Sequence, residues 1–164
     1  MLARYTYKTL IGNIVITEEN EKIIGIEFEE SSLKIEEEIQ IKQTALIKRT
    51  YQQIKEYLEG NRKQFDIPIN LKGTTFRLKV WNALLTIPYG ETKSYQEIAK
   101  QVKSPKACRA VGMANHNNPI SIIVPCHRVI GKSGKLVGYG GGLEIKEKLL
   151  EIEKKYSTNS KIFI

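Results

Sequence analysis

The sequence contains little of what a membrane, secreted or metal-dependent protein requires. No apolar run approaches the ~18 residues that a membrane-spanning helix needs, and no basic segment followed by an apolar one opens the chain. Two cysteines, Cys108 and Cys126, do not make a disulfide scaffold. Two histidines, His116 and His127, lack the spacing of zinc ligands. We therefore expect a cytoplasmic protein that has no membrane association, no metal and no cofactor.

Acidic residues become scarce in the second part of the chain. Residues 1–72 contain 11 Lys or Arg and 12 Asp or Glu, whereas residues 73–164 contain 15 and 6. The whole basic excess behind the net charge of +8 thus belongs to the second part. Such an excess suits a polyanion, most simply nucleic acid. A basic surface kept only for solubility would give the same numbers.

The N-terminal part, residues 1–72, has the pattern of a small α/β domain. Short apolar runs predict strands at residues 2–8, 12–17 and 22–28, joined as an antiparallel meander. Residues 29–43 are acidic and predict a surface loop with a short helical piece. Apolar residues at three- and four-residue spacing predict a helix over residues 44–59. Nothing in this domain has a catalytic pattern.

The C-terminal part, residues 73–164, predicts a mainly helical domain. Thr74 is the expected N-cap of a helix that ends at Leu85, and Ser94 with Glu97 predicts a capping box for a helix over residues 95–102. A third helix is expected over residues 107–115. This helix–turn–helix pattern is typical of DNA-binding domains, although helical hairpins in ordinary cores look similar. Basic residues surround the turn: Lys93, Lys100, Lys103, Lys106 and Arg109.

The residues after the helix pair predict a wing and a last helix. Residues 129–138 are expected to form a hairpin that places Lys132 and Lys135 at its tip, against a phosphate backbone. A glycine-rich loop, residues 139–142, allows backbone N–H groups to approach a ligand closely. The last helix is predicted over residues 143–156, followed by a loosely held tail over residues 157–164.

The segment with the most chemical information is Pro125-Cys126-His127-Arg128, which follows the apolar run at residues 120–124. It lies between the helices predicted over residues 107–115 and 143–156. Cationic neighbours lower a cysteine pKa and favour the reactive thiolate. The competing interpretation is a structural cysteine in the core, because free cysteine is among the most buried residue types. We interpret Cys108 as a helix-packing residue.

Taken together, these motifs resemble the O6-alkylguanine-DNA alkyltransferases, also called methylated-DNA–protein-cysteine methyltransferases. The resemblance covers about residues 74–155 and agrees in order and spacing. It rests on five features: Pro125-Cys126-His127-Arg128, Asn118-Pro119, Arg109-Ala110-Val111-Gly112, Ser94-Tyr95, and residues 139–143. It implies a ribonuclease H-like N-terminal domain with a small antiparallel sheet and a helix, followed by a winged helix-turn-helix domain.

The resemblance also implies a role for each matching residue. Cys126 would take the alkyl group from O6 of guanine, and O4-alkylthymine would react in the same way. His127 would accept the thiol proton through water, and Glu153 would orient that histidine. Asn118 would brace the turn that presents the cysteine, and Tyr95 would donate to guanine N3.

The remaining implied roles concern DNA and the base pocket. Arg109 would enter the base stack in place of the extruded nucleotide. Further DNA contacts are expected from Arg128, Ser94, Lys106, Lys132 and Lys135, and the pocket would be lined by Val129, Tyr139 and Gly140. The partner would be double-stranded DNA containing O6-alkylguanine, bound by a monomer that needs no protein partner. Gly140 stands where serine is frequent in the family, so a hydroxyl contact is lost there.

Two alternatives stay open on the sequence alone. A non-catalytic winged-helix protein that binds DNA or lesions would keep the helix pair but would not depend on Cys126. A cysteine hydrolase that uses Cys126 and His127 is disfavoured, because neighbours in sequence rarely form the facing pair that such an enzyme needs.

Overall fold

The computed structural model divides the chain into two compact units. The first contains Met1–Lys72 together with Pro119–Ser121, and the second contains Gly73–Asn118 and Ile122–Ile164. The structure describes residues 1–28, 39–132, 134, 139 and 142–162. The division falls where the sequence predicted a domain boundary, except that residues 119–121 pack with the first unit. Within the described ranges, no helix has the length and hydrophobicity needed to cross a membrane.

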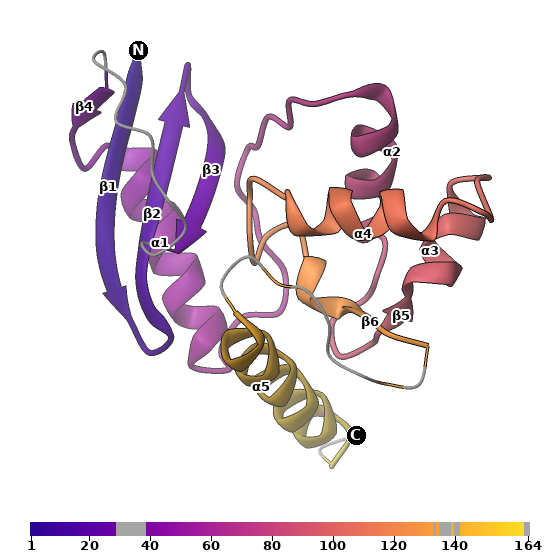
Figure 1. Cartoon of the computed structure of the whole chain (residues 1–164). Helices are drawn as coiled ribbons and strands as arrows, with labels where there is room; N and C mark the ends of the chain where they lie inside the picture. The colour runs from indigo at the N-terminus through magenta and orange to yellow at the C-terminus, as the bar shows by residue number, and fades with distance from the viewer. Residues whose placement is uncertain (29–38, 133, 135–138, 140–141, 163–164) are drawn as a thin grey trace. The chain divides into compact units, whose positions relative to one another are not determined.

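A four-stranded sheet forms the first unit (Figure 1). Strands β1 (Leu2–Thr9), β2 (Gly12–Glu19) and β3 (Lys22–Phe28) make the predicted antiparallel meander. A fourth strand, β4 (Ile39–Ile41), pairs parallel with β1, so the sheet is mixed. The prediction of a loop was therefore wrong for residues 39–41. Three residues are too few to show a period-2 pattern, and the pairing depends on the partner strand. The rest of that predicted loop, residues 29–38, lies outside the described ranges.

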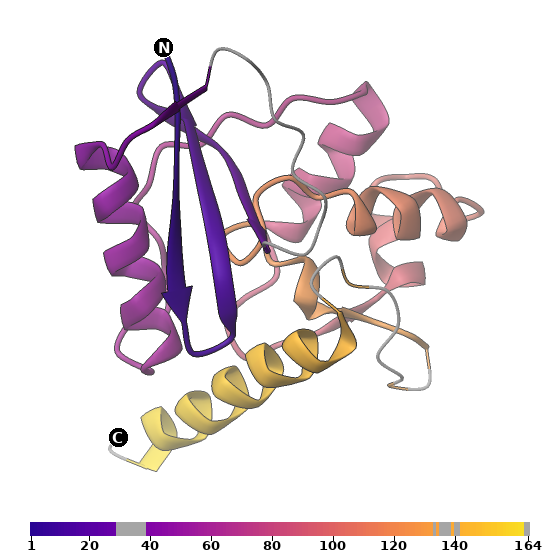
Figure 2. The ribbon, with the colours of Figure 1, turned by 60° about the vertical axis from the view of Figure 1, so that its left-hand side comes forward.

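Helix α1 (Ala45–Leu58) covers one face of this sheet (Figure 2). The helix begins where the Thr44 hydroxyl accepts a hydrogen bond from the Ile47 N–H, so Thr44 is its N-cap. Ile47, Ile54 and Tyr57 are fully buried, which accounts for the three- and four-residue spacing of the apolar side chains.

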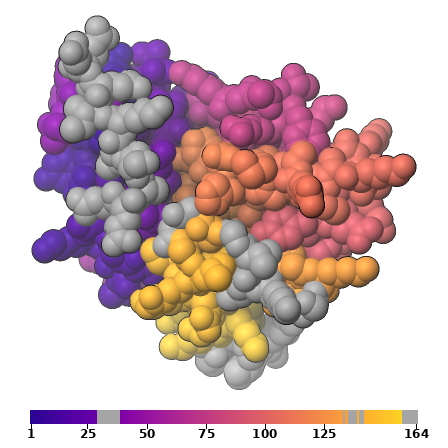
Figure 3. Space-filling model, in the orientation of Figure 1, coloured from indigo at the N-terminus to yellow at the C-terminus, as the bar shows by residue number. Residues whose placement is uncertain are grey.

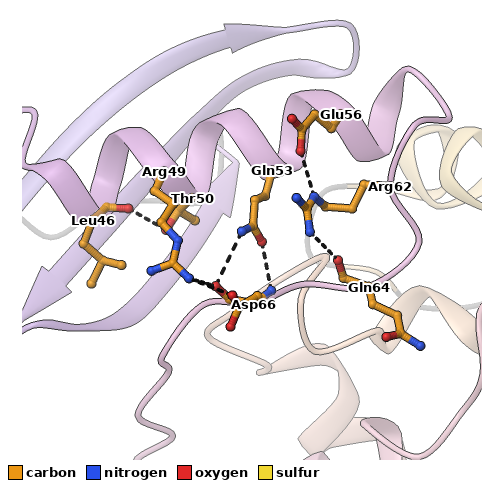
Figure 4. Close-up of polar contacts among 8 residues, drawn as sticks. All are labelled: Leu46, Arg49, Thr50, Gln53, Glu56, Arg62, Gln64 and Asp66. Atoms are coloured by element: carbon orange, nitrogen blue, oxygen red, sulfur yellow. Dashed lines mark hydrogen bonds and ion pairs between the residues drawn. The ribbon is translucent and has the colours of Figure 1, made fainter.

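The chain after α1 returns along the helix and is fixed to it by side chains (Figure 4). Arg49 forms an ion pair with Asp66 at 3.1 Å, and Gln53 Oε1 accepts the Asp66 N–H at 2.9 Å. Arg62 forms an ion pair with Glu56 at 2.8 Å. These contacts hold the connector in one path before it reaches the second unit.

The outer edge of β3 is occupied by two short segments. Ile69 and Ile120 each form an isolated parallel bridge, with Ile23 and Ile26 respectively. The Ile26 N–H donates to Pro119 O at 3.0 Å, and the Ser121 N–H donates to Ile26 O at 3.1 Å. These backbone hydrogen bonds explain why residues 119–121 belong to the first unit.

The second unit consists mainly of helices: α2 (Thr75–Leu84), α3 (Tyr95–Gln101), α4 (Cys108–His116) and α5 (Leu143–Ile162). The predicted cap at Thr74 and the capping box of Ser94 with Glu97 are both present. Its core is fully or almost fully buried and contains Val80, Leu84, Ile98, Ala99, Val111, Ala114, Val124 and Leu149. Trp81 crosses this core and donates its indole N–H to Ala114 O at 2.8 Å.

The structure tests two further predictions for the second unit, the hairpin over residues 129–138 and the tail over residues 157–164. Strand β6 (Val129–Ile130) pairs parallel with β5 (Lys93–Ser94). The second arm of the predicted hairpin and its Lys135 lie outside the described residues. The predicted tail was wrong for residues 157–162, because α5 continues to Ile162, and residues 163–164 lie outside the described ranges. No glycine or proline interrupts residues 143–162, so nothing in the sequence ends the helix at Tyr156.

Candidate active site

The backbone around Cys126 is held by two asparagines. Cys126 begins a short 3₁₀ turn, η1 (Cys126–Arg128), and is 3% exposed. Asn118 donates to Val124 O at 2.8 Å, and Asn115 donates to Cys126 O at 3.2 Å. In the same loop Ile122 has φ of 75°, a conformation that costs a β-branched residue on the order of 1–3 kcal/mol. Asn118 therefore lies where the resemblance expects a brace, and it holds a strained loop.

The Cys126 thiol is protonated at rest. Burial raises its pKa to about 11, although a hydrogen bond with Asn118, the charge of Lys146 and a hydrogen bond with Tyr139 oppose the shift. The cations near Cys126 therefore do not keep it as a thiolate, and of the two interpretations left open by the sequence the buried position is the one observed. Desolvation outweighs the nearby positive charge. Reaction at Cys126 therefore requires a base that removes the proton.

His127 and Glu153 form a buried pair beside the cysteine. His127 Nε2 lies 2.6 Å from Glu153 Oε2, and the two side chains are 0% and 1% exposed. Burial alone would raise the pKa of Glu153, but hydrogen bonds and charges from His127 and Arg128 lower it to about 2. The ionised carboxylate must accept the Nε2–H, which leaves the lone pair on Nδ1. Burial also lowers the pKa of His127, so the imidazole is neutral near pH 7 and has the form of a base.

Arg128 does not occupy the surface position that a DNA contact needs. It is 7% exposed, and its guanidinium donates to Glu153 Oε1 at 2.8 Å and to Oε2 at 3.1 Å. A further N–H donates to Ile87 O at 2.7 Å. The prediction that Arg128 contacts DNA was therefore wrong. The 3₁₀ turn directs its side chain towards the buried carboxylate of α5, which is a stronger partner for a fork of N–H donors.

Lys146 is a site residue that sequence reasoning missed. Its side chain is fully buried, and Nζ donates to Val129 O at 2.6 Å. Burial lowers the pKa of Lys146 to about 8. The spacing offered a signal, because residues 146, 149 and 153 are separated by three and four positions and share one face of α5. A lysine aligned with Leu149 and Glu153 lies on the buried side of that helix.

Two tyrosines stand near the thiol. Tyr95 begins α3 and is partly buried; burial raises its pKa, a thiolate at Cys126 acts in the same direction, and a hydrogen bond with Asn115 opposes both. The Lys146 ammonium lies 6.0 Å from the centre of the Tyr95 ring. Tyr139 is 6% exposed, and a hydrogen bond with it opposes the rise in the pKa of the Cys126 thiol. The structure thus places Tyr95 and Tyr139 near the cysteine. Val129 is the first residue of β6 and is fully buried, and Gly140 lies outside the described residues.

The remaining predicted DNA contacts differ in position. Arg109 on α4 and Lys106 before it are exposed, as is Lys132 after β6. Helix α4, drawn in orange in Figure 3, forms part of the visible surface of its unit. The Ser94 hydroxyl accepts the Glu97 N–H as the cap of α3. Over the described ranges, no group of three or more His, Cys, Asp or Glu side chains is placed to hold a metal ion.

Comparisons with known proteins give consistent matches along the chain. Residues 75–155 match the family model for the DNA-binding domain of 6-O-methylguanine DNA methyltransferase, and residues 2–71 match the model for its ribonuclease-like domain. A methylated-DNA–protein-cysteine methyltransferase of Mycobacterium tuberculosis is 62% identical over 102 residues. That alignment covers 62% of each chain, which is less than two thirds of the relative's length.

Other relatives align over more of their length. A methylated-DNA–protein-cysteine methyltransferase of Methanosarcina acetivorans is 46% identical over 148 residues, which is 90% of this chain and 95% of that one. The crystal structure of Mycobacterium tuberculosis OGT in complex with DNA superposes with a TM-score of 0.88 at 44% identity, covering 94% of both chains. With both of its parts matched, the chain belongs to the 6-O-methylguanine DNA methyltransferase family.

Proposed function

We propose that the protein repairs O6-alkylguanine in duplex DNA by transferring the alkyl group to Cys126, once per molecule. The observation that carries the proposal is a buried, protonated thiol next to a histidine whose proton position is fixed by an ionised carboxylate. This arrangement supplies a nucleophile together with its base. Similarity to proteins named methylated-DNA–protein-cysteine methyltransferases supports the same conclusion.

The reaction balances without a cofactor. His127 accepts the proton of Cys126 Sγ–H through water, and the sulfur forms a bond to the alkyl carbon as the bond from that carbon to O6 breaks. The electron pair remains on the purine, which takes up a proton and becomes guanine. A tyrosine hydroxyl, such as that of Tyr95, stabilises the developing negative charge. Water does not cleave the thioether product, so each molecule reacts once. The same chemistry applies to O4-alkylthymine.

The lesion must leave the duplex to reach a thiol that is 3% exposed. Extrusion costs a few kcal/mol of stacking and pairing. On this proposal Arg109, which is exposed on α4, fills the vacated position, while the exposed Lys106 and Lys132 contribute positive charge against phosphates. A basic excess confined to residues 73–164 suits this task. We further propose that the protein works as a monomer without a protein partner.

A non-catalytic lesion-binding protein is the alternative, and two findings weigh against it. The relatives above are named as methyltransferases. A pure binding protein also has no need for a neutral histidine with an ionised, fully buried partner. In such a protein the buried carboxylate could be replaced by an apolar side chain of similar volume with little loss of stability, because a buried ion pair is seldom needed for stability alone.

Matched cysteine variants test the proposal. Cys126→Ala should bind duplex DNA containing O6-methylguanine but leave the methyl group on the base. Cys108→Ala, which alters the other cysteine of the chain, should transfer normally. The assay incubates each variant with the duplex and measures the remaining O6-methylguanine by chromatography of the digested DNA. Transfer by Cys126→Ala would overturn the assignment, as would wild-type protein that leaves the lesion unchanged.

A further inference from the structure

The guanidinium of Arg128 and the imidazole of His127 meet on a single oxygen atom. Glu153 Oε2 lies 2.6 Å from His127 Nε2 and 3.1 Å from Arg128 Nη2. Arg128 Nε binds the other oxygen, Oε1, at 2.8 Å, and the Gly90 N–H also donates to Oε1, at 3.1 Å. Arg128 is therefore joined to the same carboxylate that orients the proposed base.

The charges of this group sum to zero only because Arg128 is present. His127 is neutral, Glu153 is negative and Arg128 is positive, and all three are at most 7% exposed. A buried group with a net charge pays a large desolvation penalty and neutralises itself when a proton is available. Without Arg128 the pair of His127 and Glu153 would have a charge of −1.

Other charged or titratable groups also lie around the pair. On α5, the Lys146 ammonium binds Val129 O, and Lys154 lies with Glu153 on the lining of a cavity of about 390 Å³. From the loop after α2, the Tyr89 ring lies 5.7 Å from the Arg128 guanidinium. In η1, the Cys126 thiol is neutral. Arg128 binds the Glu153 carboxylate through two N–H groups, at 2.8 and 3.1 Å.

We propose that Arg128 is a positioning residue whose buried charge prevents the His127–Glu153 pair from taking up a proton, so that His127 accepts the proton of Cys126. The proposal rests on the alkyl-transfer function above. Arg128 therefore sets the protonation state of the His127 imidazole and does not make the expected contact with DNA. Proton uptake by the pair would convert His127 into an imidazolium, which has no lone pair to receive the thiol proton.

The proposal predicts a specific change in pH dependence. Removal of an opposite charge bonded to a carboxylate shifts the titration of the pair upward by about 1–3 pH units. In Arg128→Met the alkyl-transfer rate should therefore be lost at neutral pH and recovered as the pH rises. Arg128→Lys keeps the positive charge but loses the paired N–H donors of the guanidinium. The pH below which its alkyl-transfer rate falls should therefore stay near that of the wild type.

The test follows His127 directly by ¹⁵N NMR of the imidazole as a function of pH. The chain has two histidines, and the exposed His116 serves as an internal reference in each spectrum. Single-turnover transfer to Cys126 is measured over the same pH range. Lys154→Met, which removes an exposed cation next to Glu153 in sequence, is the matched control and should titrate like the wild type.

A double variant separates charge from folding. Arg128→Met combined with Glu153→Gln has no net charge at the site, so His127 should again stay neutral at pH 7. The proposal is overturned if His127 in Arg128→Met titrates as in the wild type, or if the double variant titrates like Arg128→Met. It is also overturned if Arg128→Lys shifts as far as Arg128→Met. Wild-type protein that transfers no alkyl group would refute the proposed function, whereas the NMR titration would still decide the role of Arg128.

Discussion

Replacement of Glu153 by glutamine should both destabilise the protein and slow alkyl transfer. In the folded state the pKa of Glu153 is lowered to about 2, because hydrogen bonds and charges from His127 and Arg128 outweigh the burial that would raise it. An unfolded glutamate has a pKa of about 4.3, and each unit of difference corresponds to about 1.4 kcal/mol. The carboxylate therefore contributes about 3 kcal/mol at neutral pH.

The sign of the pH dependence follows from the lowered pKa. This stabilisation is present above the unfolded pKa of about 4.3 and is lost as the pH falls towards the folded value. Glutamine keeps the shape of the side chain but leaves the Arg128 charge buried without an anion. Loss of one partner from such a pair costs about 3–5 kcal/mol. We expect Glu153→Gln to lower the free energy of unfolding by this amount at neutral pH.

Urea unfolding followed by circular dichroism measures the effect at neutral pH and at about pH 3. The difference between Glu153→Gln and the wild type should narrow at the lower pH. Glu151→Gln, an exposed position on the same helix, is the control and should unfold like the wild type. Equal stability of Glu153→Gln and wild type at neutral pH, or a difference that widens on acidification, would refute the reasoning.

Two further substitutions address the loop and the DNA surface. Asn118→Ala removes the donor to Val124 O in a loop that contains the positive φ of Ile122. It should lower the free energy of unfolding by about 1–3 kcal/mol and slow alkyl transfer. A variant that matches the wild type in both urea midpoint and transfer rate would show that the hydrogen bond from Asn118 is dispensable. Arg109→Ala should slow repair of duplex DNA at least about 10-fold while leaving the reaction with free O6-alkylguanine base nearly unchanged. Equal losses with both substrates in single-turnover assays would contradict the intercalating role of Arg109.

Local signals in the sequence predicted the elements whose geometry is set by nearby residues. Ser94 and Glu97 cap α3 through contacts three residues apart, and such contacts are visible in the sequence. The parallel pairing of β4 was not predictable in this way, because it depends on β1, more than thirty residues away. The same limit applied to the end of α5, where no local stop signal exists.

The sequence predicted which residues form the site, but it did not predict their burial or their pKa values. The pairing of His127 with Glu153 followed from the family resemblance, and the structure places them 2.6 Å apart. By contrast, the buried position of Arg128 and the raised pKa of Cys126 depend on how the second unit packs around them. A row of cations in the sequence does not reveal which of them face solvent and which neutralise a buried carboxylate. Lys146 illustrates the same point, since its helical spacing marks a buried face but not its bond to Val129 O.

The identity of the alkyl acceptor is the central claim, and peptide mass spectrometry tests it most directly. Wild-type protein is incubated with an excess of duplex DNA containing O6-methylguanine, and the digested protein is analysed for added methyl groups. The account predicts one methyl group per chain, located on Cys126, with no further loss of lesion after the protein is consumed. A methyl group on Cys108 or on any other residue would contradict it, as would continued turnover by unmodified protein.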